Sequence, residues 1–192
     1  MVWLILGLVL FLGVHSVRVF AEDWRTNTRA RLGENAFKGV YSVVSVLGFG
    51  LIIWGFGQAR LQPVVVWTPP VGMRHLASLL TLLAFVSLAA AYVPGNAIKA
   101  RLHHPMVLAV KVWALGHLLA NGTLADVLLF GSFLLWAVLS FKAARGRDRA
   151  AGTTYPAGTL AGTGIAVVVG VAAWLGFALW AHGVLIGVRP FG

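Results

Sequence analysis

The stretch that decides the fold runs from His104 to Gly122 and reads HPMVLAVKVWALGHLLANG. Most of it is apolar, yet Lys111 and His117 stand inside the apolar run. An ionisable side chain in a bilayer costs roughly 2.5 to 3.5 kcal/mol on insertion scales, and it usually faces the protein interior, a cavity or a partner group. The stretch therefore predicts a membrane helix and marks the place where a functional site is expected.

The whole chain has the composition of a membrane protein. Hydrophobic residues make up 59% of its 192 residues and charged residues only 10%, against about 25% charged in an average soluble domain. A chain of this length holds about six spans of roughly 20 residues. The sequence thus predicts an all-α polytopic membrane protein, a bundle of about six transmembrane helices forming one domain over residues 1–192. The expected spans are Val2–Ala21, Ala36–Phe56, Gly72–Tyr92, Pro105–Ala120, Leu124–Phe141 and Leu160–Ile186, and the polar segments between them, such as 22–35 and 142–149, are expected to be loops.

The basic residues orient this bundle. Most lysines and arginines follow the first, third and fifth spans, so the positive-inside rule places both termini outside, at the periplasmic face of the inner membrane in a Gram-negative bacterium. The basic residues after these three spans are Arg25, Arg29, Arg31, Lys38, Lys99, Arg101, Lys142, Arg145, Arg147 and Arg149. The net charge is +10, and because the basic residues flank the spans, we expect them to contact anionic headgroups of the lipid bilayer and not nucleic acid.

Histidine is the main candidate ligand, because the chain has six histidines and no cysteine. His15 and His117 each have apolar neighbours on both sides and no acid close by, which favours a functional role. His75 and His103 are expected to be polar anchors at the interface. His182, two residues after Trp180, suits an aromatic belt as well as a ligand role.

The helix that starts at Pro105 carries its polar groups on different faces. At 100° per residue, His104 and Lys111 share one face and His117 points to another. His104 precedes a proline in the first turn, so its imidazole is a candidate cap for the helix. Lys111 is expected to pair with a buried acceptor or an anionic group, and Asp126 is a weak candidate for that partner.

Five features together resemble the NnrU family over essentially the whole chain: His15-Ser16 closing the first span, His104-Pro105, Trp113, His117 and Asn121-Gly122. That family is named for denitrification gene clusters and is similar to 15-cis-zeta-carotene isomerase, a membrane protein that carries haem b. The resemblance implies haem with axial ligands at His15 and His117, and a requirement for His104. It also implies a hydrophobic polyene as substrate if the protein is a redox-gated cis-trans isomerase.

One departure concerns the isomerase mechanism. The plant form of the carotene isomerase has a cysteine three residues before its haem ligand on the fourth helix. That cysteine is proposed to exchange with histidine as ligand when the haem is reduced. The present chain has Ala114 at the corresponding position. That exchange is therefore unavailable here. If haem is bound, its propionates are expected near Arg18, one turn after His15 on the same side of the helix.

Other ligand arrangements stay open. The predicted span limits put His15 and His117 at different depths, on the order of 10 Å apart along the membrane normal by the helical rise. His15 with His104, or His117 with His182 or His75, would lie at matching depths. The outer trio of His75, His117 and His182 is an alternative site, for a histidine-bound metal ion without a porphyrin.

Two further function classes remain beside a haem enzyme. The segment Arg101-Leu102-His103-His104-Pro105 resembles an element of membrane methyltransferases of the isoprenylcysteine carboxyl type, but the paired acids of those enzymes are absent from 142–149. A non-enzymatic accessory protein that handles haem or metal is the other class. The sequence predicts neither whether the protein is an enzyme nor its oligomeric state.

Overall fold

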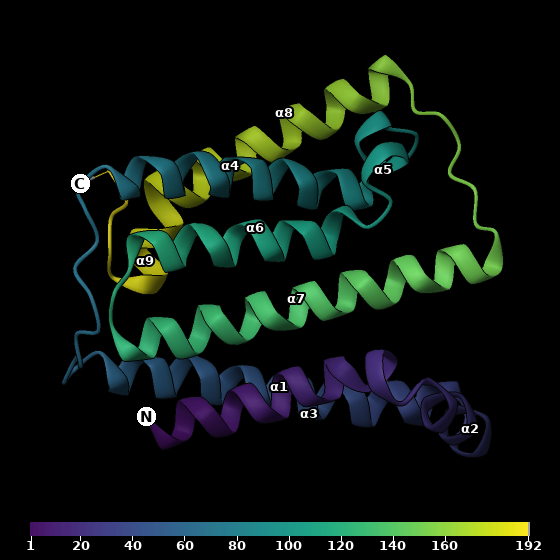
Figure 1. Ribbon diagram of the computed structural model, residues 1–192, viewed down its shortest axis with the longest axis horizontal. Coiled ribbons are helices and arrows are strands. Elements are labelled where there is room, and N and C mark those ends of the chain that lie inside the picture. Colours follow the sequence, from purple (N-terminus) through teal and green to yellow (C-terminus); the bar gives the residue numbers. More distant parts are fainter. Residues whose placement is uncertain (192) are drawn as a thin grey trace. The chain divides into compact units, whose positions relative to one another are not determined.

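The computed structural model describes residues 1–191, and nearly all of its regular structure is helical (Figure 1). Within that range the only β pairing consists of two isolated bridges. The all-α prediction is therefore confirmed. The helices are α1 (Val2–Phe20), α2 (Glu22–Leu32), α3 (Glu34–Ala59), α4 (Met73–Tyr92), α5 (Ala97–Leu102), α6 (Pro105–Ala120), α7 (Leu124–Ala151), α8 (Leu160–Gly176), the π-helical turn η1 (Phe177–Ala181) and α9 (His182–Ile186).

Among the described residues, five helical segments are long and apolar enough to cross a membrane. They are α1, α3, α4, α7 and the continuous segment Leu160–Ile186, which comprises α8, η1 and α9. The shorter apolar helix α6 has 16 residues. These six correspond to the six predicted spans, and the protein is a multi-pass membrane protein.

Two segments predicted as loops are helical. The segment after the first span forms α2, with Glu22 and Asp23 in its first turn and Arg29 and Arg31 in its last. Charges so placed complement the helix dipole. The basic segment 142–149 continues α7 to Ala151, because lysine, alanine and arginine are good helix formers. The helix ends before Gly152, whose φ of +60° suits glycine.

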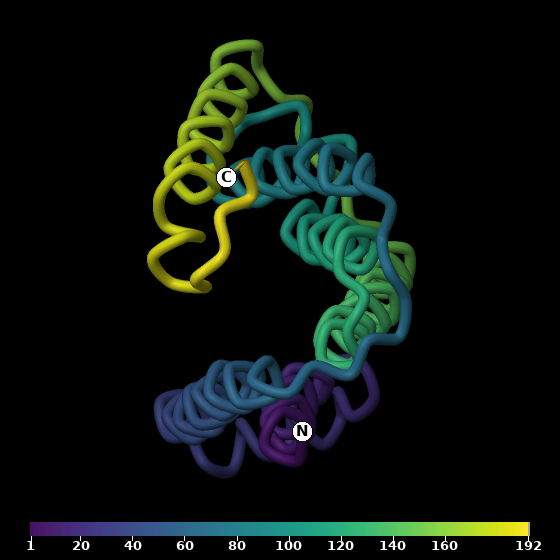
Figure 2. The backbone as a smooth tube through the Cα atoms, turned by 90° about the vertical axis from the view of Figure 1, so that its left-hand side faces the viewer, coloured from purple at the N-terminus to yellow at the C-terminus, as the bar shows by residue number. Residues whose placement is uncertain are grey.

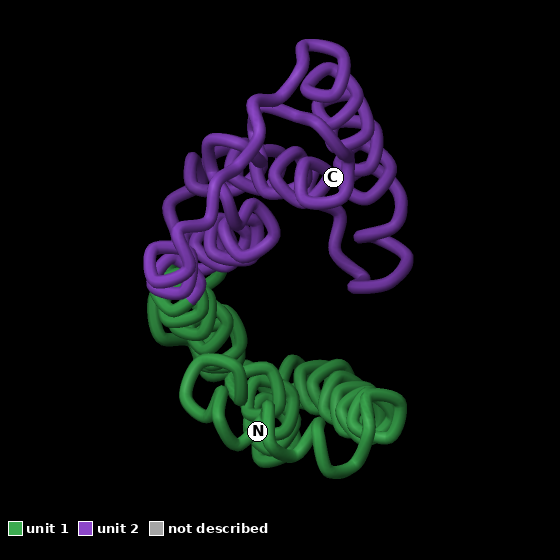
Figure 3. The backbone as a smooth tube through the Cα atoms, turned by 90° about the vertical axis from the view of Figure 1, so that its right-hand side faces the viewer, with its two compact units in different colours: residues 1–68, 121–143 green, residues 69–120, 144–192 purple. Residues whose placement is uncertain are grey.

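The chain divides into two compact units (Figure 3). Unit 1 comprises Met1–Thr68 and Asn121–Ala143, and unit 2 comprises Pro69–Ala120 and Ala144–Gly192. The residues of α7 belong to unit 1 up to Ala143 and to unit 2 from there on.

Unit 1 is built on close packing of α1 against α3, which lie side by side in Figure 2. A Cβ added at Gly7 would lie 2.6 Å from the backbone N of Ile52, and one at Gly48 would lie 2.7 Å from the backbone N of Phe11. Only glycine fits at such distances, and small residues let membrane helices approach closely. The first part of α7 joins this pair through the Phe11–Phe133 ring contact, at 5.8 Å between centroids.

Unit 2 is organised around α4, which packs against both α6 and α8. A Cβ at Gly170 of α8 would lie 2.5 Å from the Cα of Val86 of α4, so this approach is also close. The Trp174 indole N–H donates to the Thr81 hydroxyl across the same interface at 3.1 Å. Asn96 is buried and its amide donates to the Ala90 carbonyl at 2.9 Å, which fixes the end of α4 to the start of α5.

Candidate functional site

His15 lies where three helices of unit 1 meet. Its Nδ1 is 2.6 Å from the carbonyl oxygen of Phe11, one turn earlier on α1, and the two rings stack at 4.2 Å. Tyr41 of α3 and Trp136 of α7 approach the imidazole at 5.2 and 6.2 Å between ring centroids. A carbonyl only accepts, so Nδ1 carries the proton and Nε2 carries the lone pair that a metal would need.

Two buried donors on α7 lie in the same unit. The Trp136 Nε1 and the Ser140 Oγ are both buried, and neither has a hydrogen-bond partner among residues 1–191. The whole Ser140 residue is only 8% exposed. Most buried polar groups are hydrogen-bonded, and a helical serine usually reaches the carbonyl one turn earlier. These two donors therefore stand out, because the described part of the chain supplies no acceptor for either of them.

His117 of α6 has the same local arrangement as His15. Its Nδ1 is 2.9 Å from the carbonyl oxygen of Trp113, again one turn earlier, and the ring centroids of Trp113 and His117 are 5.1 Å apart. The proton is again assigned to Nδ1 and the lone pair to Nε2. In both cases an aromatic residue precedes the histidine by four positions. Histidines that bind metals usually donate their other ring N–H in this way, which fixes the tautomer and the ring orientation.

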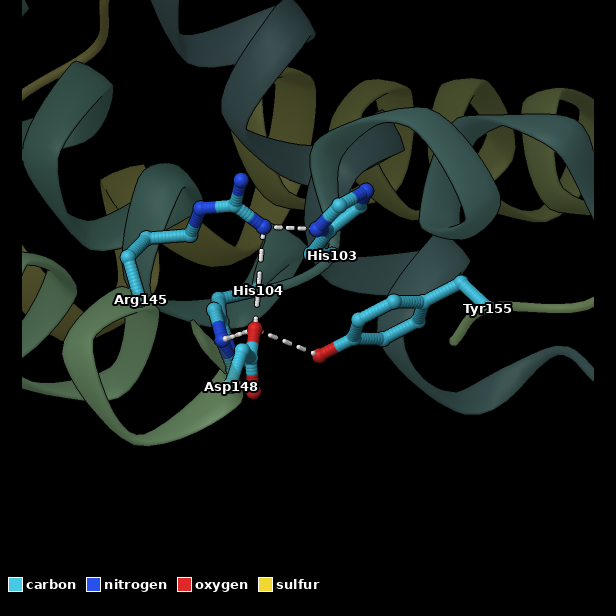
Figure 4. A network of polar contacts seen from close by, with 5 residues as sticks. All are labelled: His103, His104, Arg145, Asp148 and Tyr155. Atoms are coloured by element: carbon cyan, nitrogen blue, oxygen red, sulfur yellow. Dashed lines mark hydrogen bonds and ion pairs between the residues drawn. The ribbon is translucent and has the colours of Figure 1, made fainter. Parts of the chain in front are cut away.

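His104 belongs to a polar network in unit 2, which we call the Asp148 network: His103, His104, Arg145, Asp148 and Tyr155 (Figure 4). One oxygen of Asp148, Oδ2, accepts from His104 Nε2 at 2.7 Å and from the Tyr155 hydroxyl at 3.0 Å. Arg145 lies 3.6 Å from the same oxygen and also contacts His103 Nδ1. The His103 ring stacks on Tyr155 at 4.2 Å. The network therefore ties the start of α6 to the end of α7 and to the following loop.

The backbone and burial of this network are unusual. The φ of His103 is +64°, a value that non-glycine residues rarely adopt and that often marks functional sites. The side chains of Asp148 and His104 are 14% and 22% exposed. Burial and the hydrogen bond to the Asp148 carboxylate raise the pKa of Tyr155 above its usual 10.0, so the phenol stays a donor at neutral pH. His103, expected to be an interfacial anchor, is thus held by Arg145 and Tyr155.

The remaining candidates have other surroundings. The Arg18 side chain is 60% exposed, with Nε 3.8 Å from the Glu22 carboxylate. Lys111 is partly buried on α6. Asp126, the weak candidate partner for it, accepts from the Thr123 N–H at 3.0 Å and hydroxyl at 2.6 Å. Asp126 therefore caps the start of α7, in the manner of a capping box.

The outer histidines do not gather into a metal centre. His75 is exposed in the first turn of α4, and His182 Nδ1 donates to the Val188 carbonyl at 2.6 Å. Within residues 1–191 no three side chains from His, Asp and Glu form a group that could hold a metal ion. The suggested trio of His75, His117 and His182 is therefore not assembled. His15 lies in unit 1, whereas His104 and His117 lie in unit 2.

Sequence reasoning missed four residues that take part in these arrangements. Asp148 carried a signal, because it is the one acid within the basic run 142–149. No sequence signal marked the other three, Trp136, Ser140 and Tyr155, because these residue types are common in membrane helices and loops. Their significance comes from burial and from contacts with residues distant in the chain.

Comparison with curated proteins and with solved structures finds no match. The model of one protein family, described as NnrU protein, does match the chain. It covers residues 3–190 and so includes His15, the His104-Pro105 pair and His117. Because the match extends over nearly the whole chain, the protein belongs to the NnrU family.

Proposed function

We propose that the protein is a haem-binding integral membrane protein in which His15 and His117 are the iron ligands. The observation that carries the proposal is their shared arrangement, in which Nδ1 donates to the carbonyl one turn earlier, so that Nε2 is the nitrogen that would bind a metal. This is the arrangement in which an imidazole is oriented and made more basic for a metal. It also agrees with the ligand pair that the family resemblance implies.

The residues present fit a porphyrin better than a bare ion. A zinc or similar ion needs three or four protein ligands, and no such group exists among residues 1–191. A haem iron receives four nitrogens from the porphyrin and needs only one or two from the protein. The aromatic rings of Phe11, Tyr41 and Trp136 surround His15 and offer the apolar surface that a porphyrin requires.

The chain's own residues would have distinct tasks in such a site. Bound haem would supply one-electron chemistry and a Lewis acid. The carbonyls of Phe11 and Trp113 accept from Nδ1 of His15 and His117, so Nε2 is the nitrogen that would bind the iron in each histidine. His104 is a positioning residue in this proposal. Through Asp148 it anchors the start of α6, the helix that carries His117.

Two activities are compatible with this cofactor. The first is redox-gated cis-trans isomerisation of a hydrophobic polyene, as in the similar carotene isomerase. The second is a non-enzymatic role in handling haem or electrons linked to denitrification. One observation favours the second: Ala114 is fully buried at the position where the plant enzyme has its exchangeable cysteine, so the known ligand switch has no counterpart here.

The proposal is tested by haem content. We expect the protein purified in detergent to show a Soret band, and His15→Ala and His117→Ala each to lose most of the haem measured by the pyridine haemochrome assay. His75→Ala is the matched control, because His75 is exposed on α4. Full haem in both ligand variants would refute the pair, and a colourless wild type after haem supplementation would refute the cofactor.

The same series ranks the other residues. His104→Ala should lower haem content by less than His117→Ala if His104 only positions α6. Arg18→Ala should lower haem affinity if Arg18 pairs with a propionate, and should leave it unchanged if the side chain only contacts headgroups and Glu22. Turnover of a cis-carotenoid by reduced protein would then separate the isomerase from the accessory role.

A further inference from the structure

The two buried donors on α7 lie beside His15 and the turn of α1 that follows it. Ring contacts join Phe11 to Phe133 and His15 to Trp136. Residue numbers rise together on both helices, so α1 and α7 run parallel here. The next turn of α7, which holds Ser140, therefore lies at the level of the α1 turn that holds Arg18.

The chemistry of these donors specifies the kind of group they bind. An indole N–H can only donate, and a hydroxyl without a donor beside it has its own proton to give. Both atoms are buried and unpartnered among residues 1–191, so each requires an acceptor that the described chain does not provide. Arg18, at the same level, adds positive charge. An anionic acceptor such as a carboxylate fits this combination best.

We propose that Trp136 and Ser140 form a donor pair that binds a propionate carboxylate of the haem ligated by His15. This inference rests on the proposed function, since the carboxylate belongs to the proposed cofactor. Trp136 and Ser140 are one turn apart on the same face of α7, the face on which the Trp136 ring contacts His15. The pair fixes the rotation of the porphyrin about the iron, which a histidine ligand alone does not.

The test compares two porphyrins that differ only in the carboxylates. The full-length apoprotein in detergent is titrated with haemin and with haemin dimethyl ester, and binding is followed by the Soret band and by quenching of tryptophan fluorescence. We expect the wild type to prefer haemin. Trp136→Phe and Ser140→Ala should each reduce this preference by about tenfold, the size expected for one hydrogen bond to a charged group.

Matched controls come from α3. Trp54→Phe changes an exposed tryptophan of the same unit, and Ser45→Ala removes a hydroxyl that already donates to the Tyr41 carbonyl at 2.8 Å. Both should keep the wild-type preference for haemin. The α-helical circular dichroism signal reports that each variant is folded.

The outcomes separate this inference from the proposed function. An unchanged preference in Trp136→Phe and Ser140→Ala, with haem still bound, overturns the donor pair and leaves the proposed function standing. Equal loss of affinity for both porphyrins also overturns it, since that points to packing. If the wild type binds neither porphyrin, the proposed function fails and the donor pair fails with it.

Discussion

Replacing Asp148 with Asn should loosen the end of α7. The substitution keeps the shape of the side chain but removes the negative charge of the carboxylate that accepts hydrogen bonds from His104 and Tyr155. An amide oxygen still accepts, but more weakly than a carboxylate. The start of α6, the end of α7 and the loop that holds Tyr155 would then be less firmly joined.

The magnitude follows from the two short hydrogen bonds. Hydrogen bonds to charged groups contribute about 1.5–3 kcal/mol and neutral ones about 0.5–1.5 kcal/mol. Asp148 is only 14% exposed, so solvent screens little of that difference. A loss of about 1 kcal/mol at each bond gives about 2 kcal/mol in total. For a protein of this size that corresponds to a decrease of about 4–8 °C in Tm.

The assay combines thermal unfolding in detergent with limited trypsin digestion. Trypsin should cut Asp148→Asn faster than the wild type after the arginines at the end of α7, because that end frays when the network is broken. Asp23→Asn, at an exposed acid of α2, is the control and should change neither measurement. A Tm and a digestion pattern equal to those of the wild type would refute the structural role given to Asp148.

Three further predictions concern the network, the packing and the topology. Because the pKa of Tyr155 is raised, its hydrogen bond to Asp148 should persist below pH 10. The bond should be lost as the pH rises through the folded-state pKa of Tyr155. A spectrophotometric titration at alkaline pH should therefore show a late phenolate step in the wild type that is missing in Tyr155→Phe. Gly48→Ala should destabilise the protein by about 1–3 kcal/mol, because the added Cβ would clash with the backbone of Phe11. Gly50→Ala is the control and should not destabilise it, because a Cβ at Gly50 would lie in open space. Equal Tm values for the two variants would count against the α1–α3 packing. Reporter fusions after Gly152 and at the C-terminus should report opposite sides of the membrane, and equal sidedness would contradict the predicted topology.

The helical spans could be predicted because their cause is local. Insertion of a span depends on hydrophobicity summed over about 20 consecutive residues, so α4, α6 and α7 begin within a residue of the expected positions. The ends were less predictable. The basic end of α7 was expected to be a loop, because charge indicates where the apolar run stops but not where the helix stops.

The candidate site was predictable only in part, for the same physical reason. Sequence alone singled out His15 and His117 as candidates, since an ionisable group among apolar neighbours is visible within a few residues. It also determined the membrane character, the all-α class and the resemblance to the NnrU family. Only the tertiary structure decided that Asp148 meets His104, 44 positions away, and that Trp136 lies beside His15 with no hydrogen-bond partner for its indole N–H within residues 1–191. Such contacts depend on which helix faces pack together, and helix packing is settled by long-range fit between side chains that no local pattern records.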